Sequence, residues 1–246
     1  MRDQIEKAYF FSKKEFLLLL GIAGIQEIYS FRMPESQEVT SEELIYSLYQ
    51  LIKKGLIQME EGVLKLPQEL ASLMETFREE GQVLSAIPGR ANSQLIFYFA
   101  SHGISVVEAC PDKGGLRVGL VSAGDVWERL TGEETMDRPL LETEEEGLSL
   151  EQYSEGITTE RESMEKLPLP SLTEPLLSCM DQKPVTAAWE LFDLKERNVL
   201  ERILFLKGTI HSWILKQEGQ ERLVMPDSKE VREKLRQQLI SGRITE

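Results

Sequence analysis

Residues Leu95–Leu130, LIFYFASHGISVVEACPDKGGLRVGLVSAGDVWERL, are the stretch that decides the fold. The stretch contains two long apolar runs and a shorter third one, separated by turns, and it ends in an amphipathic segment. Short apolar runs bounded by turn residues are typical of strands, and apolar residues three or four positions apart are typical of a helix. The stretch therefore predicts a three-stranded meander that is closed by a helix.

A second stretch, Ile203–Leu239, repeats this order of elements: ILFLKGTIHSWILKQEGQERLVMPDSKEVREKLRQQL. The two histidines of the chain, His102 and His211, fall at nearly matching points of the two copies. Self-similarity of this kind indicates a duplicated scaffold. Few identities survive between the copies, so a common meander-and-helix arrangement without duplication stays open. We expect an α+β fold with a pseudo-two-fold arrangement, in which helices flank an antiparallel sheet.

Residues 1–81 predict a winged-helix-like part, which is a set of helices with one small hairpin. Two helix starts carry a capping box, in which a hydroxyl residue is followed three positions later by a glutamate. These two pairs are Ser12 with Glu15 and Thr40 with Glu43. The expected elements are a helix from Ser12 to Leu20, helices over Ile22–Tyr29 and Ser41–Gly55, a hairpin over Leu56–Leu66, and a helix from Pro67 to Phe77.

The helix before the wing lacks a basic surface. A winged helix that binds DNA neutralises phosphates with lysine and arginine, and this supplies most of its non-specific affinity. The segment Ser41–Gly55 has Lys53 and Lys54, but these stand beside Glu42 and Glu43. The formal net charge of the chain, −14, also disfavours nucleic acid. We therefore favour a scaffold or partner-binding winged helix, with a regulatory protein as the alternative.

The sequence predicts four parts. Gly81–Ser93, which contains Pro88 and Gly89, is expected to be a linker before the first meander. Helices are expected before the second meander, at Ser171–Met180 and at Val185–Leu194. The four parts are the winged-helix-like residues 1–81, a first sheet–helix unit at 82–135, an acidic loop at 136–166 and a second helix–sheet–helix unit at 167–246.

The acidic loop, residues 136–166, is rich in glutamate and poor in basic residues. Such a segment cannot bury enough apolar surface by itself to offset the entropy of ordering it. One interpretation is a solvated linker. The other is a docking arm that orders on a partner, because apolar residues recur along it. The candidate partner-binding residues are Leu140, Leu141, Leu148, Leu150, Tyr153 and Ile157.

Motifs that carry chemistry are absent from the sequence. It has no phosphate-binding glycine loop, no dinucleotide fingerprint and no nucleophile elbow. Its two cysteines, Cys110 and Cys179, have no metal-ligand spacing and are expected to be reduced. We therefore expect no catalytic residue, no cofactor and no metal, and we do not expect an enzyme. The apolar run Phe16–Ile25 is shorter than the about 20 residues that span a bilayer, so we expect a cytoplasmic protein without membrane insertion.

The order of elements resembles that of the EspG family of mycobacterial type VII secretion chaperones. The segment SQLIFYFASHGISVVEACPDKGGLRVGLVSAGDVWERL, residues 93–130, carries the resemblance best. The chain also looks like proteins of unknown function that occur in Firmicute gene clusters beside LXG toxins and small WXG-type helical proteins. The resemblance implies an EspG-like fold and a cytosolic adaptor for a helical export substrate. The chain departs from the family in being shorter and in having a plainer winged helix.

Three hypotheses for function follow. The first is a chaperone or adaptor that binds the helical N-terminal region of an LXG-type effector, with or without small WXG-type proteins, and keeps it soluble for export. The second is an immunity protein that neutralises the toxin domain of such an effector. The third is the winged-helix regulatory protein. The first two differ in which end of the toxin is bound.

Overall fold

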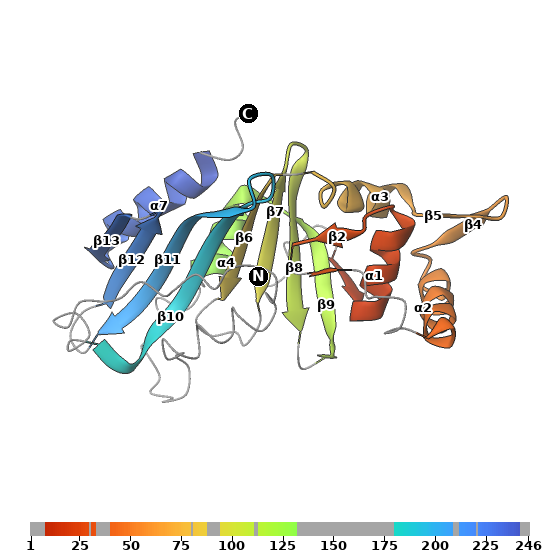
Figure 1. Ribbon diagram of the computed structural model, residues 1–246, viewed down its shortest axis with the longest axis horizontal. Helices are drawn as coiled ribbons and strands as arrows, with labels where there is room; N and C mark the ends of the chain where they lie inside the picture. The colour runs from red at the N-terminus through yellow and green to blue at the C-terminus, as the bar shows by residue number, and fades with distance from the viewer. Residues whose placement is uncertain are drawn as a thin grey trace. The chain divides into compact units, whose positions relative to one another are not determined.

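The computed structural model describes residues 8–29, 31–32, 40–79, 81–87, 94–110, 113–131, 180–208, 212–219 and 221–241. Within these ranges the chain forms five helices and a nine-stranded antiparallel sheet (Figure 1). The helices are α1 (Lys13–Ile22), α2 (Ser41–Lys53), α3 (Gln68–Glu75), α4 (Ala123–Thr131) and α7 (Lys229–Ser241). In hydrogen-bonding order the strands are β1 (Ala8–Phe11), β9 (Gly115–Val121), β8 (Gly103–Cys110), β7 (Leu95–Ala100), β6 (Gln82–Ile87), β10 (Met180–Asp193), β11 (Asn198–Gly208), β12 (Ser212–Glu218) and β13 (Glu221–Pro226). Two small hairpins are separate from this sheet: β2 (Glu27–Ile28) with β3 (Phe31–Arg32), and β4 (Gln58–Glu60) with β5 (Val63–Lys65).

Both copies of the predicted repeat are present. The first copy is β7, β8 and β9 followed by α4, and the second is β11, β12 and β13 followed by α7. Each meander is preceded by one more strand, β6 or β10, and these two strands pair with each other in antiparallel register. The α+β fold class with its pseudo-two-fold arrangement and antiparallel sheet is therefore confirmed.

Two segments that the sequence predicts as a helix and a linker contain strands instead. The expected helix at Val185–Leu194 is instead part of strand β10, which hydrogen-bonds to a strand on each side. The expected linker at Gly81–Ser93 contains strand β6, and its Val83, Leu84 and Ala86 are buried. A strand whose two faces are both buried shows a continuous apolar run, which periodicity cannot distinguish from a buried helix or a short apolar linker.

The expected helix at Ile22–Tyr29 is also wrong. Helix α1 ends at Ile22, and Ala23 is its C-cap. Gly24 then adopts a φ of 75°, in the left-handed region where glycine has no steric cost. The chain continues into the short strand β2. The N-terminal part therefore has three helices, with the β2–β3 hairpin before α2 and the β4–β5 hairpin before α3.

The described chain divides into two compact units. Unit 1 is Met1–Gly81 with Phe97–Ser122, and unit 2 is Gln82–Ile96 with Ala123–Glu246. Helix α4, which ends the first copy of the repeat, thus belongs with the second meander. The four-part division predicted from the sequence stays a prediction.

The core of unit 1 is a series of aromatic contacts. The Phe16 ring packs on Phe11 of β1 and on Phe77, with centroids 6.1 and 5.8 Å apart, and Phe77 meets Tyr98 edge-on at 4.8 Å. The Tyr98 hydroxyl donates a 2.6 Å hydrogen bond to the Tyr29 carbonyl, so its polar end is satisfied although the ring is buried. Burial raises the pKa of Tyr98 well above its usual value. Strand β1, which the sequence did not reveal, is therefore attached by both the sheet and this core.

The core of unit 2 centres on two tryptophans. Trp127 of α4 meets Trp189 of β10 edge-on, with centroids 5.5 Å apart, and Trp189 lies 4.9 Å from Phe205 of β11. The guanidinium of Arg232 on α7 stands 5.3 Å from the Phe205 ring centroid and is held by Asp227. Both helices thus cover the same face of β10 and β11.

A buried ion pair crosses the sheet of unit 2. Arg202 of β11 donates to Oε1 of Glu190 on β10, from Nε at 2.7 Å and from Nη2 at 2.5 Å. Both side chains are 5% exposed, and the two residues are direct cross-strand partners. Alternation along β10 places Glu190 on the face opposite Trp189. Since a buried charge is costly without its partner, this pair fixes the register of the two strands.

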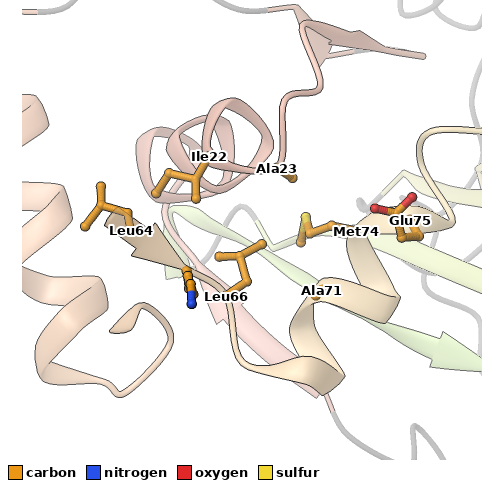
Figure 2. Close-up of a pocket in the computed structure, with 8 residues that line it drawn as sticks. Ile22, Ala23, Leu64, Leu66, Ala71, Met74 and Glu75 are labelled. Atoms are coloured by element: carbon orange, nitrogen blue, oxygen red, sulfur yellow. The ribbon is translucent and has the colours of Figure 1, made fainter. Parts of the chain in front are cut away.

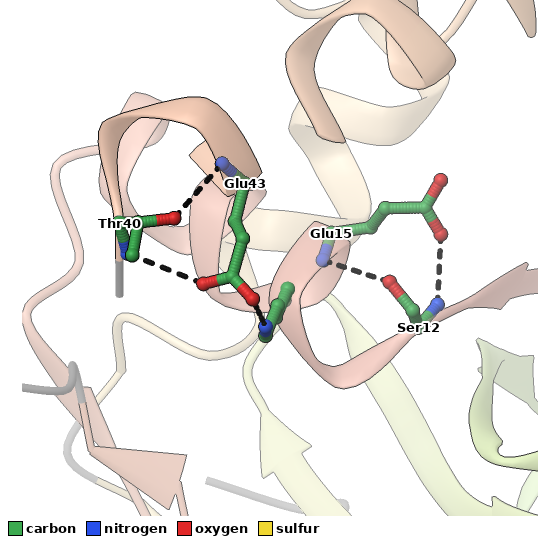
Figure 3. Close-up of polar contacts among 5 residues, drawn as sticks. Ser12, Glu15, Thr40 and Glu43 are labelled. Atoms are coloured by element: carbon green, nitrogen blue, oxygen red, sulfur yellow. Dashed lines mark hydrogen bonds and ion pairs between the residues drawn. The ribbon is translucent and has the colours of Figure 1, made fainter. Parts of the chain in front are cut away.

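Two ion pairs connect α1 and α2 through their capping boxes; Figure 3 shows the two boxes and the ion pair at Glu43. Both predicted boxes form: the side chain of Glu15 accepts from the Ser12 N–H, and that of Glu43 accepts from the Thr40 N–H. Each of these glutamates also binds a lysine of the other helix: Glu43 of α2 binds a lysine of α1, and Glu15 of α1 binds the lysine that caps α2. Lys14 Nζ lies 2.5 Å from Glu43 Oε1, and Nζ of Lys54, the C-cap residue of α2, lies 2.6 Å from Glu15 Oε1. Helix α2 is therefore held against α1 near both of its ends.

Truncation of Arg202 tests the buried pair. We expect Arg202→Ala to lower the free energy of unfolding by about 3–5 kcal/mol, because the Glu190 carboxylate stays buried without its guanidinium. The double variant Glu190→Leu with Arg202→Met should recover most of that loss. Urea unfolding followed by circular dichroism measures both variants. Arg236→Ala, which removes an exposed pair with Glu233, is the control, and equal stability of Arg202→Ala and this control would contradict the assignment.

A pH titration tests the link between α1 and α2. The hydrogen bond from Lys14, followed by the Thr40 N–H, lowers the pKa of Glu43 below its ordinary value of 4.5. A lowered carboxyl pKa contributes stability above the unfolded value, and this is lost as the pH falls through the folded value. Lys14→Met should move the Glu43 pKa back toward 4.5, as read from the NMR shift of its carboxyl carbon. The neighbouring Lys13→Met should leave it unchanged, and an unchanged Glu43 pKa in both variants would show that the pair does not form.

Candidate partner-binding surface

Helix α2 carries apolar side chains on its solvent side. Ile45, Tyr49 and Ile52 are 66%, 60% and 39% exposed, and they follow the i, i+4, i+7 spacing of one helical face. Tyr46 extends this face and is 65% exposed. A stripe with this spacing normally faces a core or a partner. On α2 it faces solvent.

The opposite side of α2 accounts for its attachment. Leu51 is fully buried there, and the small buried residue Ser47 lies one turn away. Helix α2 packs on α1, and the two ion pairs with Lys14 and Glu15 hold it there. The geometry leaves the stripe no freedom to turn inward, because turning α2 would expose Leu51 and break both ion pairs.

The β4–β5 hairpin, which we call the wing, also carries exposed apolar side chains. Met59 on β4 and Val63 on β5 are 63% and 58% exposed. Among the described residues, seven of the eleven large apolar side chains that are exposed lie between residues 44 and 63. Such concentration marks an interaction surface, whereas single exposed apolar residues are ordinary. We call this set without Leu44, which lies on the Leu51 side of α2, the α2–wing surface; it consists of Ile45, Tyr46, Tyr49, Ile52, Met59 and Val63.

An open apolar hollow of about 250 Å³ lies beside the wing (Figure 2). Its lining comes from the end of α1, from β5 and from α3, and Figure 2 shows Leu64, Leu66 and Met74 around the space between these elements. Met59 is the cross-strand partner of Leu64, so its side chain lies on the same face of the hairpin. The hollow is of a size for one or two apolar side chains of a partner, not for a buried cofactor.

The charges around the surface have both signs. Glu42 and Glu43 stand at the start of α2, with Lys53 and Lys54 at its end. On the wing, Glu60 pairs with Lys65, and this hydrogen bond lowers the pKa of Glu60. Helix α2, which would contact DNA in a DNA-binding winged helix, therefore lacks a basic stripe that could bind phosphates. The mixed rim with an apolar and aromatic centre is typical of a protein interface.

The helix over Ser41–Gly55 follows from the sequence, but its exposed face does not: Ile45 and Ile52 are exposed, whereas Leu51 is buried. The sequence does contain a sign of this face, because Tyr46 and Tyr49 make the apolar side of the helix wider than one packed face requires. The six residues predicted to bind a partner, Leu140, Leu141, Leu148, Leu150, Tyr153 and Ile157, lie outside the described residues and stay a prediction.

The described histidine and cysteine, His102 and Cys110, each contact neighbouring residues. His102 lies in the turn between β7 and β8, with Nδ1 2.8 Å from Oε1 of Glu79. The Ser101 N–H, at 2.7 Å, is the main cause of a lowered pKa for Glu79. Burial raises the pKa of the free thiol of Cys110, which disfavours its thiolate. His211 and Cys179 lie outside the described residues.

The part of the chain that the structure describes contains neither a metal-ligand cluster nor a helix that could cross a membrane. Within it, no three histidine, cysteine, aspartate or glutamate side chains gather as metal ligands would. None of its helices has the length and apolar content needed to cross a bilayer. The α2–wing surface thus remains the strongest candidate site in the described chain.

The chain resembles known proteins in fold and not in sequence. No protein-family model matches the chain, and no curated protein matches its sequence. Among solved structures, its fold is similar to that of the Mycobacterium tuberculosis type VII secretion system chaperone EspG5, solved in complex with the PE25–PPE41 dimer. The match covers 96% of this chain and 96% of that chain, at a TM-score of 0.56 and 9% sequence identity. Identity this low shows the fold alone, and the chain has an EspG-like fold.

Proposed function

We propose that this protein is a cytoplasmic chaperone or adaptor that binds a helical protein destined for secretion and keeps it soluble until export. The observation that carries the proposal is the wing part of the α2–wing surface, where the exposed Met59 stands beside an open apolar hollow. The likeness of the fold to EspG5, solved with the PE25–PPE41 dimer, supports a binding role of this kind.

The wing and its hollow are the proposed contact for the cargo. A helical partner would place an apolar anchor residue among Leu64, Leu66 and Met74, with Met59 on its flank. Apolar anchors that fill a pocket dominate the energetics of interfaces. The mixed charges of Glu60, Lys65 and Glu75 would form the rim of this contact.

The proposed cargo is the helical N-terminal region of an LXG-type effector, with or without a small WXG-type protein. In this proposal the acidic loop acts as a docking arm, in which Leu140, Leu141, Leu148, Leu150, Tyr153 and Ile157 supply apolar anchors among carboxylates. Such an arm would suit a lysine-rich helical tip, because its glutamates oppose the lysines. Stoichiometric capture needs no catalytic residue and no cofactor.

Copurification tests the function. The full chain, expressed with the N-terminal helical region of the LXG-type effector from its own gene cluster, should form a complex that survives gel filtration. Capture of the C-terminal toxin domain instead would indicate the immunity protein. Retardation of duplex DNA at low salt would indicate the regulator. Either result, without capture of the helical region, would overturn the chaperone proposal.

Charge insertion tests the site. Met59→Glu should weaken capture of the helical region by at least about tenfold, because a carboxylate cannot enter an apolar contact without losing its hydration. Calorimetric titration with the purified effector region measures the change. Leu223→Glu, on the exposed strand β13 of unit 2, is the matched control and should bind as the wild type does. Equal affinity of the two variants would move the contact away from the wing.

A further inference from the structure

The exposed face of α2 is self-complementary when a second copy of it is placed in the opposite direction. Tyr49 stands at the middle of the apolar stripe, with Ile45 about one turn before it and Ile52 about one turn after it. When two such helices lie antiparallel about a two-fold axis beside Tyr49, Ile45 of each copy faces Ile52 of the other. The apolar part of the stripe therefore matches itself.

The charges at the ends of α2 agree with this arrangement. Four charged residues stand at the ends of α2. Two of them are paired inside unit 1, since Glu43 binds Lys14 and Lys54 binds Glu15. The other two, Glu42 and Lys53, are exposed, and neither makes an ion pair with another residue in the described ranges. They have opposite signs and stand at opposite ends of the helix.

Glu42 and Lys53 also lie on the same side of the stripe. At 3.6 residues per turn they have nearly the same direction around the helix axis, next to Tyr49. A two-fold axis between antiparallel helices brings like flanks together, so Glu42 of one copy meets Lys53 of the other, twice. In a parallel pair the two flanks would point to opposite sides, and the residues would not meet. The charges therefore select the antiparallel arrangement.

We propose that α2 is a homodimer interface, in which the stripes of two copies pack antiparallel with reciprocal Glu42–Lys53 ion pairs. The interface is isologous, as two-fold dimers require. One pair of helices buries less surface than a standard stable interface, so the dimer is weak and depends on concentration. Aromatic residues such as Tyr46 and Tyr49 are enriched at interfaces of this kind. The inference is independent of the cargo proposal, which assigns the wing.

Charge reversal tests the dimer with the protein alone. Sedimentation velocity of the full chain, over roughly a hundredfold range of concentration, should show a monomer–dimer equilibrium. Glu42→Lys and Lys53→Glu should each weaken dimerisation by about tenfold, because like charges then meet across the two-fold axis. The double variant Glu42→Lys with Lys53→Glu should restore it, since the pairs reform with reversed signs. Tyr49→Glu should abolish it.

Matched controls separate this inference from the cargo proposal. Leu223→Glu on β13 and Met59→Glu on the wing should dimerise as the wild type does, and circular dichroism should show all variants folded. A wild-type protein that stays monomeric throughout the range would overturn the inference. So would a double variant that remains as weak as the single ones. Cargo capture is measured with different variants, so either proposal can fail while the other stands.

Discussion

The antiparallel pairing of β6 with β10 is the constraint on which the rest of the sheet depends. It joins the first strand of one four-stranded meander to the first strand of the other, with Leu84 opposite Leu191 and Ser85 opposite Glu190. Because β10 also pairs with β11, both of its edges and both of its faces are occupied. That position explains why β10 carries Trp189 on one face and the buried Glu190 on the other. A shift of register by one residue would exchange these two side chains and place a carboxylate against the Trp127 ring.

A second constraint shapes the N-terminal part of unit 1. Each capping-box glutamate both closes a helix end and binds a lysine of the neighbouring helix region, so local helix formation and helix packing reinforce each other. The same contacts decide which side of α2 faces inward. An apolar helix face is thereby kept in water, at a cost that a stable monomer has no reason to bear. A protein that binds a partner through this face would bury it and remove that cost.

Part of this fold follows from the sequence. The strands β7, β8 and β9 are bounded by turns such as Ser101–His102, and both capping boxes are local patterns that need no knowledge of the remainder of the chain. Strand β10 was mistaken for a helix because its residues are apolar on both faces, and β1 was missed because its partner β9 lies far away in the sequence. The candidate surface was missed for a similar reason. Sequence identifies α2 as an apolar helix, but only its contacts with α1 determine that Leu51 is buried and Ile45 is not.

The end of β13 bears on how copies of this chain can meet. The Asp227 N–H donates to the Ser212 carbonyl, and Pro226 is the cross-strand partner of Trp213. The backbone of Pro226 therefore points away from β12, at a position where proline has no N–H to offer to a further strand. At the other end of the strand order, β1 lies along β9. The last described strand is thus a poor template for the growth of a continuous sheet, which favours self-association that ends at two copies over fibres.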